Sequence, residues 1–350
     1  MPPDALRHAI RLLTHGGSLG AGEAADAFDV VMRGEGSAAQ IAALLVGLRV
    51  KGETADEVAG AAQAMRRAMM RVPARDPDGL VDTCGTGGGA VTTFNISTAA
   101  ALLAAGMGVR VAKHGNRSFT SRCGSADVLE ALGVDIELAA EQAGAVLEEA
   151  GLVFMFAPLM HPAMRHVAPV RRELGVPTVM NVVGPLANPA GAGRQVVGVA
   201  EPARLPLLAA AIARLGAVHA LVVHGEPGMD EISPVGLTRV MEVRRGEVRE
   251  WTVEPHALGC DGSDLAELAG GGPEENAALV REVLAGGGPP TARAAVALNA
   301  AAALYVSGDA ADFAGAVRTA REGLEARMGL AALDRLRRAY RRAGDALPGP

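Results

Sequence analysis

The sequence is poor in aromatic residues and in cysteine. Phe, Trp and Tyr make up 3% of the 350 residues, whereas hydrophobic residues together make up 49%. Alanine and glycine are abundant instead, so we expect helices that pack closely through small side chains. The three cysteines, Cys84, Cys123 and Cys260, are scattered and form no CxxC pair. An odd number without a pairing pattern argues against a disulfide framework and predicts reduced thiols in a cytoplasmic protein.

The sequence also lacks long apolar runs and an excess of positive charge. A helix that spans a bilayer needs about 20 apolar residues, and the Ala-rich run near Ala99 is too short. The opening residues, MPPDALRHAIRLL, contain no apolar segment typical of a secretory signal. A formal net charge of −6 argues against general binding of nucleic acid. We therefore expect neither a membrane nor nucleic acid as a partner.

Common catalytic motifs are absent as well. His114, His161, His166 and His224 have no metal-binding spacing such as HExxH, so we interpret them as polar loop and helix-surface residues. There is no GxSxG elbow and no nucleophile-base pair within one motif. No residue is therefore assigned as acid, base or nucleophile, and the sequence indicates a site that holds anions and metal.

The pattern of apolar residues predicts a small helical domain at the start of the chain. Residues 4–72 are typical of four short helices, and the last three cover Ala21–Arg33, Ser37–Val50 and Thr54–Met70. Thr54 is the expected N-cap of the fourth helix. Such helices form a bundle, or half of one that needs a partner. A linker with two prolines, Val72–Pro77, follows.

From Leu80 onward strands alternate with helices, which predicts an α/β domain with a mostly parallel central sheet flanked by helices. The predicted parallel strands are a lead into Cys84 and the runs Val109–Ala112, Leu152–Phe156, Gln195–Val199 and Ala220–Val223. Leu237–Val243 and Val248–Val253 are predicted to form an exposed antiparallel hairpin. We expect ligands beyond the carboxyl ends of the parallel strands.

One segment of the α/β part is expected to return to the helical domain. His161–Leu174 is predicted as a single helix and Asn181–Pro189 as a loop. The predicted division assigns residues 1–73, joined by 160–190, to the helical domain. Residues 74–159 and 191–350 then form the α/β domain.

The most informative stretch is VDTCGTGGGAVTTFNIST, from Val81 to Thr98. A strand leads into the glycines at 85 and 87–89, and Asn95–Thr98 opens a helix. Loop amides and the positive end of a helix dipole form an anion site that glycines let a ligand approach. The alternative is a glycine-rich turn before a helix capped by Asn95 or Ser97. The stretch fits neither a Walker A loop nor the dinucleotide fingerprint.

Two more polar clusters follow predicted strand ends. Lys113–Ser118 combines cations, an amide and hydroxyls, which suits a phosphate ester, although a solvated polar loop is the alternative. Asp230 and Glu231 are adjacent carboxylates that can share Mg²⁺ with a bound polyphosphate. Their alternative interpretation is an acidic pair at a helix N-terminus.

Three arginines lie in the predicted helix after His161. Arg165 and Arg172 share one face of that helix, and Arg171 lies about 100° away from Arg172. An arginine fork could bind a carboxylate, but a solvated basic face is the default interpretation.

Taken together, these motifs resemble those of the anthranilate phosphoribosyltransferases. The matching segments are CGTGG followed by TFNIST, KHGNRS, HPAMRHVAPVRRELG, NVVGPLANP, VVHGEPGMDEIS and, in the helical part, RGEGSAAQIAALLVGLRVKGETADE. The resemblance covers nearly the whole chain, although the glycine loop alone is shared with pyrimidine nucleoside phosphorylases. It implies the nucleoside phosphorylase/phosphoribosyltransferase type of fold. It also implies pentosyl transfer from 5-phosphoribosyl 1-pyrophosphate (PRPP) to anthranilate in tryptophan biosynthesis, up to two Mg²⁺ per subunit, and a homodimer through the helical domains.

The resemblance also implies which residues form the site. The positions that match the PRPP site are Gly85, Gly88, Gly89, Thr93, Asn95, Ile96, Ser97, Thr98, Lys113, His114, Gly115, Asn116, Arg117, Ser118, Phe119, Thr120, Ser121 and Ser125. Those that match the anthranilate contacts are Gly85, Asn116 and Arg171, and those that match the magnesium ligands are Ser97, Asp230 and Glu231. One departure stands out, because the family usually reads GTGGD and this chain has Gly89 in place of the aspartate.

Two other interpretations remain open from the sequence. A nucleoside phosphorylase would need a phosphate site in place of the aromatic acid, and the GTGG loop here lacks the Val-Gly-Asp-Lys continuation associated with that group. A non-catalytic relative that binds nucleic acid is disfavoured by the acidic charge and by the intact pair Asp230 and Glu231.

Overall fold

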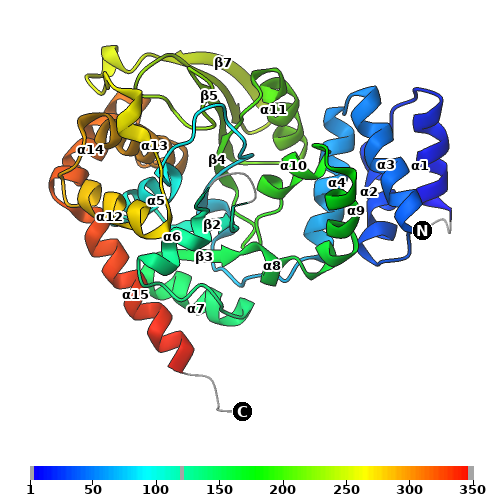
Figure 1. Ribbon diagram of the computed structural model, residues 1–350, viewed down its shortest axis with the longest axis horizontal. Helices are drawn as coiled ribbons and strands as arrows, with labels where there is room; N and C mark the ends of the chain where they lie inside the picture. Colours follow the sequence, from blue (N-terminus) through cyan, green and yellow to red (C-terminus); the bar gives the residue numbers. More distant parts are fainter. Residues whose placement is uncertain (1–3, 119–121, 346–350) are drawn as a thin grey trace.

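The computed structural model describes residues 4–118 and 122–345. Four helices lie together at one side of the molecule (Figure 1): α1 (Ala5–Thr14), α2 (Ala21–Met32), α3 (Ala38–Lys51) and α4 (Ala55–Ala68). Capping boxes set where α3 and α4 begin. Ser37 Oγ accepts from the Gln40 amide at 3.3 Å, and Thr54 Oγ1 accepts from the Glu57 amide at 3.2 Å. The predicted N-cap at Thr54 is therefore confirmed.

A seven-stranded sheet forms the centre of the remaining chain. Its strands are β1 (Val81–Gly85), β2 (Val111–Gly115), β3 (Leu152–Phe156), β4 (Arg194–Gly198), β5 (His219–Gly225), β6 (Thr238–Arg244) and β7 (Glu247–Val253). They lie in the order β3-β2-β1-β4-β5-β6-β7. The first five strands in this order are parallel, whereas β6 and β7 are antiparallel. The predicted fold class, a small helical domain and a larger α/β domain with a mostly parallel sheet, is confirmed.

The hairpin of β6 and β7 is antiparallel as predicted, but only β7 is mostly exposed. Val240, Glu242 and Val243 of β6 are buried. This strand lies between β5 and β7, and helix α11 (Leu205–Arg214) packs against it. The prediction of an exposed hairpin is therefore wrong for β6, because both faces of this strand are covered: Val240 joins the apolar cluster of α5 (Ile96–Gly106), and Val243 joins the cluster that contains α11.

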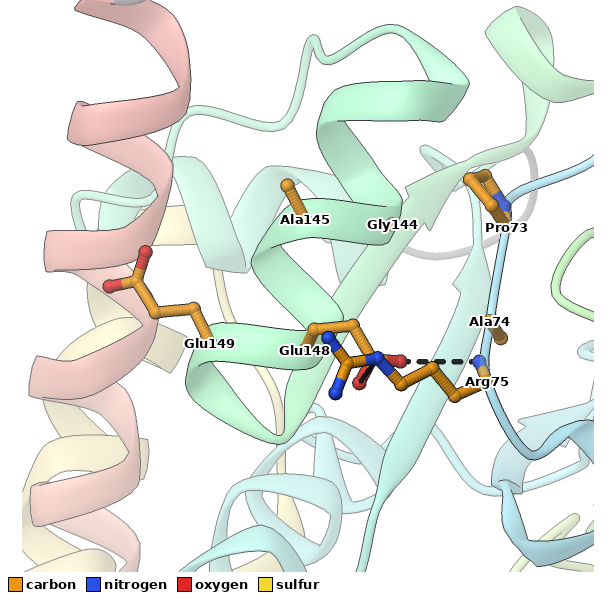
Figure 2. A pocket seen from close by; sticks show the side chains of 7 residues that line it. All are labelled: Pro73, Ala74, Arg75, Gly144, Ala145, Glu148 and Glu149. Atoms are coloured by element: carbon orange, nitrogen blue, oxygen red, sulfur yellow. Dashed lines mark hydrogen bonds and ion pairs between the residues drawn. The ribbon is translucent and has the colours of Figure 1, made fainter.

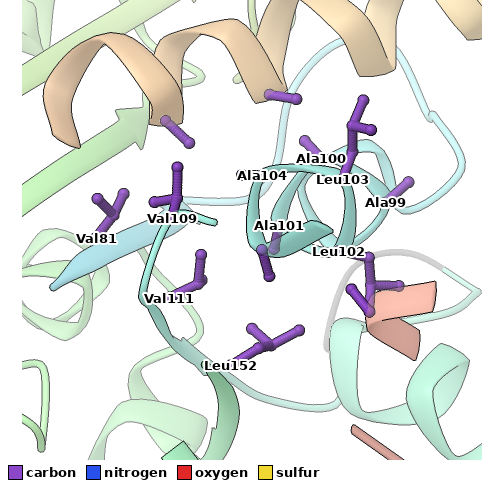
Figure 3. Close-up of a cluster of buried hydrophobic side chains, with 14 of the residues drawn as sticks. Val81, Ala99, Ala100, Ala101, Leu102, Leu103, Ala104, Val109, Val111 and Leu152 are labelled. Atoms are coloured by element: carbon purple, nitrogen blue, oxygen red, sulfur yellow. The ribbon is translucent and has the colours of Figure 1, made fainter. Parts of the chain in front are cut away.

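Helices cover both faces of the sheet. The remaining helices are α5 (Ile96–Gly106), α6 (Ser125–Ala131), α7 (Ala140–Ala150), α8 (Ala157–Met160), α9 (Ala168–Leu174), α10 (Met180–Val183), α12 (Pro273–Leu284), α13 (Pro290–Ser307), α14 (Phe313–Glu325) and α15 (Met328–Asp345). On one face, the alanines and leucines of α5 pack near Val81, Val111 and Leu152 (Figure 3). Because these side chains are small, α13 and α15 also pack closely on α5.

The opposite face of the sheet packs on α11, which in turn packs on α4 of the four-helix part. Neighbouring residues of β4 and β5 alternate between two apolar clusters, so that Val196 joins the cluster of α5 and Val197 joins that of α2, α3 and α4. Helix α11 lies within the second cluster and contacts α4. The four helices are thus attached to the sheet through a continuous apolar core.

The segment after β3 differs from its prediction. His161–Leu174 is not a single helix, because a 3₁₀ turn over Pro162–His166 is followed by α9, which has Pro169 in its first turn. Proline has no N–H to donate and so starts a new helix more readily than it continues one. The predicted loop 181–189 contains the end of α10 and a 3₁₀ turn, Gly184–Leu186. Helix α9 packs on α3, and α10 packs on α4.

Within the described residues, none of the helices is both long and apolar enough to cross a bilayer.

Candidate active site

The glycine loop leaves the sheet where the strand order reverses. Chain order runs outward from β1 to β2 and β3 on one side, and from β4 to β5 on the other. Ligands of parallel sheets bind beyond the carboxyl ends of the strands at such a switch point. Gly85 and Gly198 end β1 and β4 here and are in register with each other. The predicted strand-loop-helix unit thus lies at the place expected for a ligand site.

The loop that carries Asp230 lies across these two strand ends. A Cβ on Gly198 would overlap the carbonyl of Asp230, and a Cβ on Gly85 would lie 2.7 Å from Asp230 Oδ2. Only glycine at both positions lets the acidic loop approach the sheet this closely. The absence of a side chain at the two strand ends therefore makes room for Asp230.

The structure brings the glycine loop, the start of α5 and the acidic pair together. The amide of Gly87 donates to Asp230 Oδ2 at 2.9 Å. The amide of Ser97 donates to Glu231 Oε1 at 3.2 Å. These segments are more than 130 residues apart in sequence. Loop and helix amides thus already bind anionic groups, which here are the chain's own carboxylates.

Burial raises the pKa of both carboxyl groups. Desolvation is the main cause for Asp230, and it raises the pKa of Glu231 to about 8, with the neighbouring charge of Asp230 as the next cause. Two adjacent carboxylates in a partly buried site favour either a proton or a cation. The alternative interpretation as a helix N-terminal pair is wrong, because Asp230 and Glu231 lie in the loop between β5 and β6.

Lys113 is buried in β2, and the alternative of a solvated polar loop is wrong for this residue. Its ammonium group donates to the carbonyl of Thr83 and to Ser97 Oγ, the latter at 3.2 Å. Burial lowers the pKa of Lys113. The ammonium therefore joins β2, β1 and the start of α5, and it also experiences the negative charge of Glu231.

Asp82 and Asn188 were missed by the sequence reasoning. Asn188 Nδ2 donates to Asp82 Oδ2 and to the carbonyl of Ala112, both at 2.8 Å, while Asp82 Oδ1 accepts from the His114 amide at 3.1 Å. Both side chains are buried, and burial raises the pKa of Asp82 to about 6. In the sequence, Asp82 and Asn188 each appear only as a polar residue among apolar neighbours, and this pattern does not show that they bind each other.

The start of α5 differs from a simple capped helix. Asn95 is its N-cap residue but makes no side-chain capping bond. Its Nδ2 donates to the carbonyl of Cys123 at 3.2 Å, and its Oδ1 accepts from Asn276 Nδ2 at 2.9 Å. The amide of Ser97 binds Glu231 instead of a cap. Asn95 is therefore the N-cap residue by position, as the alternative has it, but its side chain makes no capping bond, and Ser97 lies inside the helix.

The predicted PRPP-site residues that follow β2 contact neighbouring residues of the chain. The Asn116 carbonyl accepts from Ser125 Oγ at 3.2 Å. Arg117 forms ion pairs with Asp127 at 2.8 Å and Glu130 at 2.5 Å. The structure thus brings Arg117 to α6 rather than to the acidic pair. Phe119, Thr120 and Ser121 lie outside the described residues.

Three predicted surface histidines are buried. The rings of His114 and His161 lie 4.9 Å apart, and burial is the main cause that lowers their pKa values, to about 3 and about 4. His224 Nδ1 donates to the carbonyl of Val199 at 2.7 Å. The prediction of polar loop and helix-surface residues is therefore wrong for these three, which are all buried.

Of the three arginines after His161, Arg171 differs from the other two. Arg165 and Arg172 are exposed, which fits a solvated basic face, whereas Arg171 is partly buried. Its Nη2 donates to Asn181 Oδ1 at 3.3 Å. Burial lowers the pKa of its guanidinium. Arg171 therefore presents a partly desolvated cation, the kind of group that binds a carboxylate strongly.

A surface hollow lies away from these residues, between the proline-containing linker and α7. It has a volume of about 590 Å³ and is lined by residues of the proline-containing linker and of α7 (Figure 2). Arg75 crosses it to Glu148, with its amide 3.3 Å from Oε1. None of the predicted site residues in the described ranges lines this hollow.

The donor set at the switch point suits Mg²⁺. Two carboxylates and a hydroxyl, from Asp230, Glu231 and Ser97, supply hard oxygen ligands of the type that this ion prefers. Across residues 4–118 and 122–345, no group of three or more His, Cys, Asp or Glu side chains is placed to hold a metal. Mg²⁺ commonly takes one or two carboxylates and completes its shell with water and substrate phosphates, so the residues fit the ion.

Comparison with known proteins agrees with this architecture. Residues 77–331 match the model of a glycosyl transferase family, described as its a/b domain, and residues 7–69 match the helical bundle domain of the same family. Together the two matches cover both parts of the fold. The chain therefore belongs to this glycosyl transferase family.

Its relatives within the family are anthranilate phosphoribosyltransferases. The enzyme of Rubrobacter xylanophilus is 51% identical over 96% of this chain and 98% of its own length. The enzyme of Thermus thermophilus has a crystal structure with a TM-score of 0.90 and 46% identity, covering 97% of this chain and 99% of that one. The enzyme of Saccharomyces cerevisiae, solved in complex with PRPP and Mg, has a TM-score of 0.87 at 27% identity, with coverage of 97% and 99%.

Proposed function

We propose that this protein transfers the phosphoribosyl group of PRPP to the amine of anthranilate, giving N-(5-phosphoribosyl)anthranilate and pyrophosphate. The observation that carries this proposal is the meeting of the glycine loop, the start of α5 and the acidic pair at the ends of β1 and β4. Close relatives over nearly the whole length are named for this reaction. The reaction belongs to tryptophan biosynthesis.

The glycine loop and the segments beside it hold PRPP in this proposal. Loop amides such as that of Gly87 would bind phosphate oxygens, and the fixed ammonium of Lys113 adds positive charge beside Ser97. The full proposed set is the one that the family resemblance implies, from Gly85 to Ser125. Arg171, with Gly85 and Asn116, binds the carboxylate of anthranilate.

Ser97, Asp230 and Glu231 would hold Mg²⁺, up to two ions per subunit. The ion supplies neutralisation of the pyrophosphate leaving group. The amine of anthranilate is unprotonated at neutral pH, so it needs no strong general base to attack the anomeric carbon. We accordingly assign no residue a proton-transfer role. The chain's own contribution is to position both substrates and to stabilise developing charge in an oxocarbenium-like transition state.

We further propose how the chain is organised around this reaction. Residues 1–73 with 160–190 form the helical domain that presents anthranilate, and residues 74–159 with 191–350 form the domain that binds PRPP. Hinge closure between the domains joins the two substrates. A homodimer through the helical domains and a cytoplasmic location complete the proposal. Cys84 and Cys260 are both free thiols, which suits a reducing compartment.

Loss of anthranilate fluorescence on addition of PRPP and Mg²⁺ tests the proposed reaction. We expect fluorescence to fall only when both are present, with pyrophosphate released in equal amount. A nucleoside phosphorylase would instead release thymine from thymidine and phosphate. That activity, with no loss of anthranilate, would overturn the proposal.

A further inference from the structure

Helix α13 contains one polar side chain in the middle of an apolar stretch. The residues from Ala294 to Leu304 are all buried, and Asn299 among them is only 3% exposed. Asparagine is a weak helix former, and burying its amide is unfavourable unless every polar atom finds a partner. The partners of Asn299 therefore indicate what this residue does.

Asn299 binds both backbone polar groups of Ile232, in the loop that carries Asp230 and Glu231. Its Oδ1 accepts from the Ile232 amide at 2.9 Å, and its Nδ2 donates to the Ile232 carbonyl at 3.0 Å. The second Nδ2 proton goes to the carbonyl of Ala295 at 2.9 Å, one turn earlier in α13. This third bond fixes the orientation of the side-chain amide. Both amide protons and the oxygen of Asn299 are therefore engaged with backbone groups.

Ile232 directly follows the two carboxylates, so this contact anchors one end of the pair. The Ile232 amide belongs to the peptide group that starts at Glu231, and fixing it fixes the backbone from which the Glu231 side chain extends. On the other side, Asp230 is seated against Gly198 of β4. The acidic pair is therefore held between a helix contact after it and a sheet contact at its start.

We propose that Asn299 is a positioning residue for the divalent-cation site formed by Asp230 and Glu231. Its link to turnover rests on the proposed function, but its effect on cation binding does not. By fixing Ile232, Asn299 keeps the two carboxylates directed to the ends of β1 and β4, where the amides of Gly87 and Ser97 already contact them. A preformed pair binds a cation more tightly than one that must be ordered on binding.

A purely structural role would give a different result, and Tyr340 offers the matched control. Tyr340 is 1% exposed, and its hydroxyl also binds both backbone groups of one residue, accepting from the Phe154 amide at 3.0 Å and donating to its carbonyl at 2.6 Å. That contact fixes α15 to β3, away from the acidic loop. Tyr340→Phe removes bonds of the same kind without touching Ile232.

The test measures Mn²⁺ binding by electron paramagnetic resonance, in the presence of inorganic pyrophosphate, for the full-length chain. We expect Asn299→Leu, which keeps most of the packed volume, and Asn299→Ala, which does not, to weaken Mn²⁺ binding at least tenfold. Tyr340→Phe should stay within twofold of the parent protein, even where its loss of melting temperature equals that of the Asn299 variants. Mn²⁺ binding within twofold of the parent in a folded Asn299 variant would overturn the proposal.

Turnover supplies a second and independent readout. The Mg²⁺ concentration at half-maximal rate should rise at least tenfold in the Asn299 variants, while the KM for anthranilate changes less than twofold. An equal rise in both would indicate general distortion and would also overturn the proposal. If the parent protein does not consume anthranilate, the proposed function fails, but the Mn²⁺ measurement still decides the role of Asn299.

Discussion

Gly89→Asp restores the residue that the family resemblance expects in the glycine loop, and the structure defines what the change adds. Gly89 is not in the left-handed region, so a side chain causes no backbone strain there. A Cβ at this position would lie 3.0 Å from the Gly228 carbonyl and 3.4 Å from Asp230 Oδ1. The first contact is tight and needs a shift of a few tenths of an ångström. The second places a new carboxylate beside Asp230.

The size of the effect follows from the separation of the charges. Two unit charges about 4 Å apart interact by about 1 kcal/mol in water and about 4 kcal/mol at an effective dielectric constant near 20. Asp230 and Gly89 are only partly buried, so solvent screening brings the interaction to roughly 1–2 kcal/mol. This repulsion is relieved by a bound cation. We therefore expect Gly89→Asp to lower the half-saturating Mg²⁺ concentration by roughly 5- to 30-fold, since about 1.4 kcal/mol is a factor of ten.

The assay is the initial rate against free Mg²⁺ at fixed PRPP, for the parent protein, Gly89→Asp and Gly89→Asn. The asparagine variant has the same shape without the charge, so it measures the contact with Gly228 alone. We expect its Mg²⁺ profile to match the parent within about twofold, and we expect anthranilate saturation to be unchanged in all three. Superimposable profiles for the parent and Gly89→Asp, or the same shift in both variants, would refute the electrostatic reasoning.

Three further outcomes are expected. Arg171→Ala should raise the KM for anthranilate by about 10- to 150-fold, because a charge-assisted hydrogen bond contributes roughly 1.5–3 kcal/mol. As a control, replacing the exposed neighbour in Arg172→Ala should change this KM little. An equal rise in the KM for PRPP in Arg171→Ala would count against the assignment. Asp230→Asn combined with Glu231→Gln should abolish turnover with the circular dichroism spectrum preserved, and full activity would remove the pair from the metal site. Burial in the folded protein raises the pKa of Glu231 from 4.5 to about 8, so its carboxyl group binds a proton more tightly in the folded protein than in the unfolded chain. The contribution of Glu231 to the free energy of unfolding should therefore fall as pH rises from about 4.5 to about 8. Mg²⁺ should bind more weakly as pH falls below about 8, because the proton then competes with the cation for this carboxylate. A flat Mg²⁺ affinity between about pH 6 and 8 would contradict this.

The features predicted best from the sequence are those whose evidence is contiguous. The glycine loop and the start of α5 lie within one short stretch, and the acidic pair consists of neighbouring residues. Their meeting followed from topology, since the carboxyl ends of parallel strands share one edge of the sheet. What each amide binds did not follow, because Gly87 and Ser97 contact carboxylates more than 130 residues away.

The residues that sequence reasoning missed are those whose partners lie far away in the sequence. Asn188 binds Asp82 across 106 positions, and Asn299 binds Ile232 across 67. A lone asparagine in an apolar stretch signals a buried bond but not its partner. Lys113 was placed in a loop because the predicted strand ended at Ala112, whereas β2 continues to Gly115. Strand ends in polar sequence are hard to locate, because burial by neighbouring segments decides where pairing stops.

The charge balance at the ends of β1, β2 and β4 would favour the joint binding of cation and substrate. Asp82, Asp230 and Glu231 all have raised pKa values, and Lys113 is the buried cation that acts on Asp82 and Glu231. A pyrophosphate ester alone would add negative charge to a site already short of positive charge, and it would compete with Asp230 for the amide of Gly87. A divalent cation held by Asp230 and Glu231 would supply positive charge both to these carboxylates and to the ester. Each partner then raises the affinity for the other by the same factor, and the fixed backbone at Gly198 and Ile232 keeps the carboxylates near enough to the glycine loop for that coupling to act.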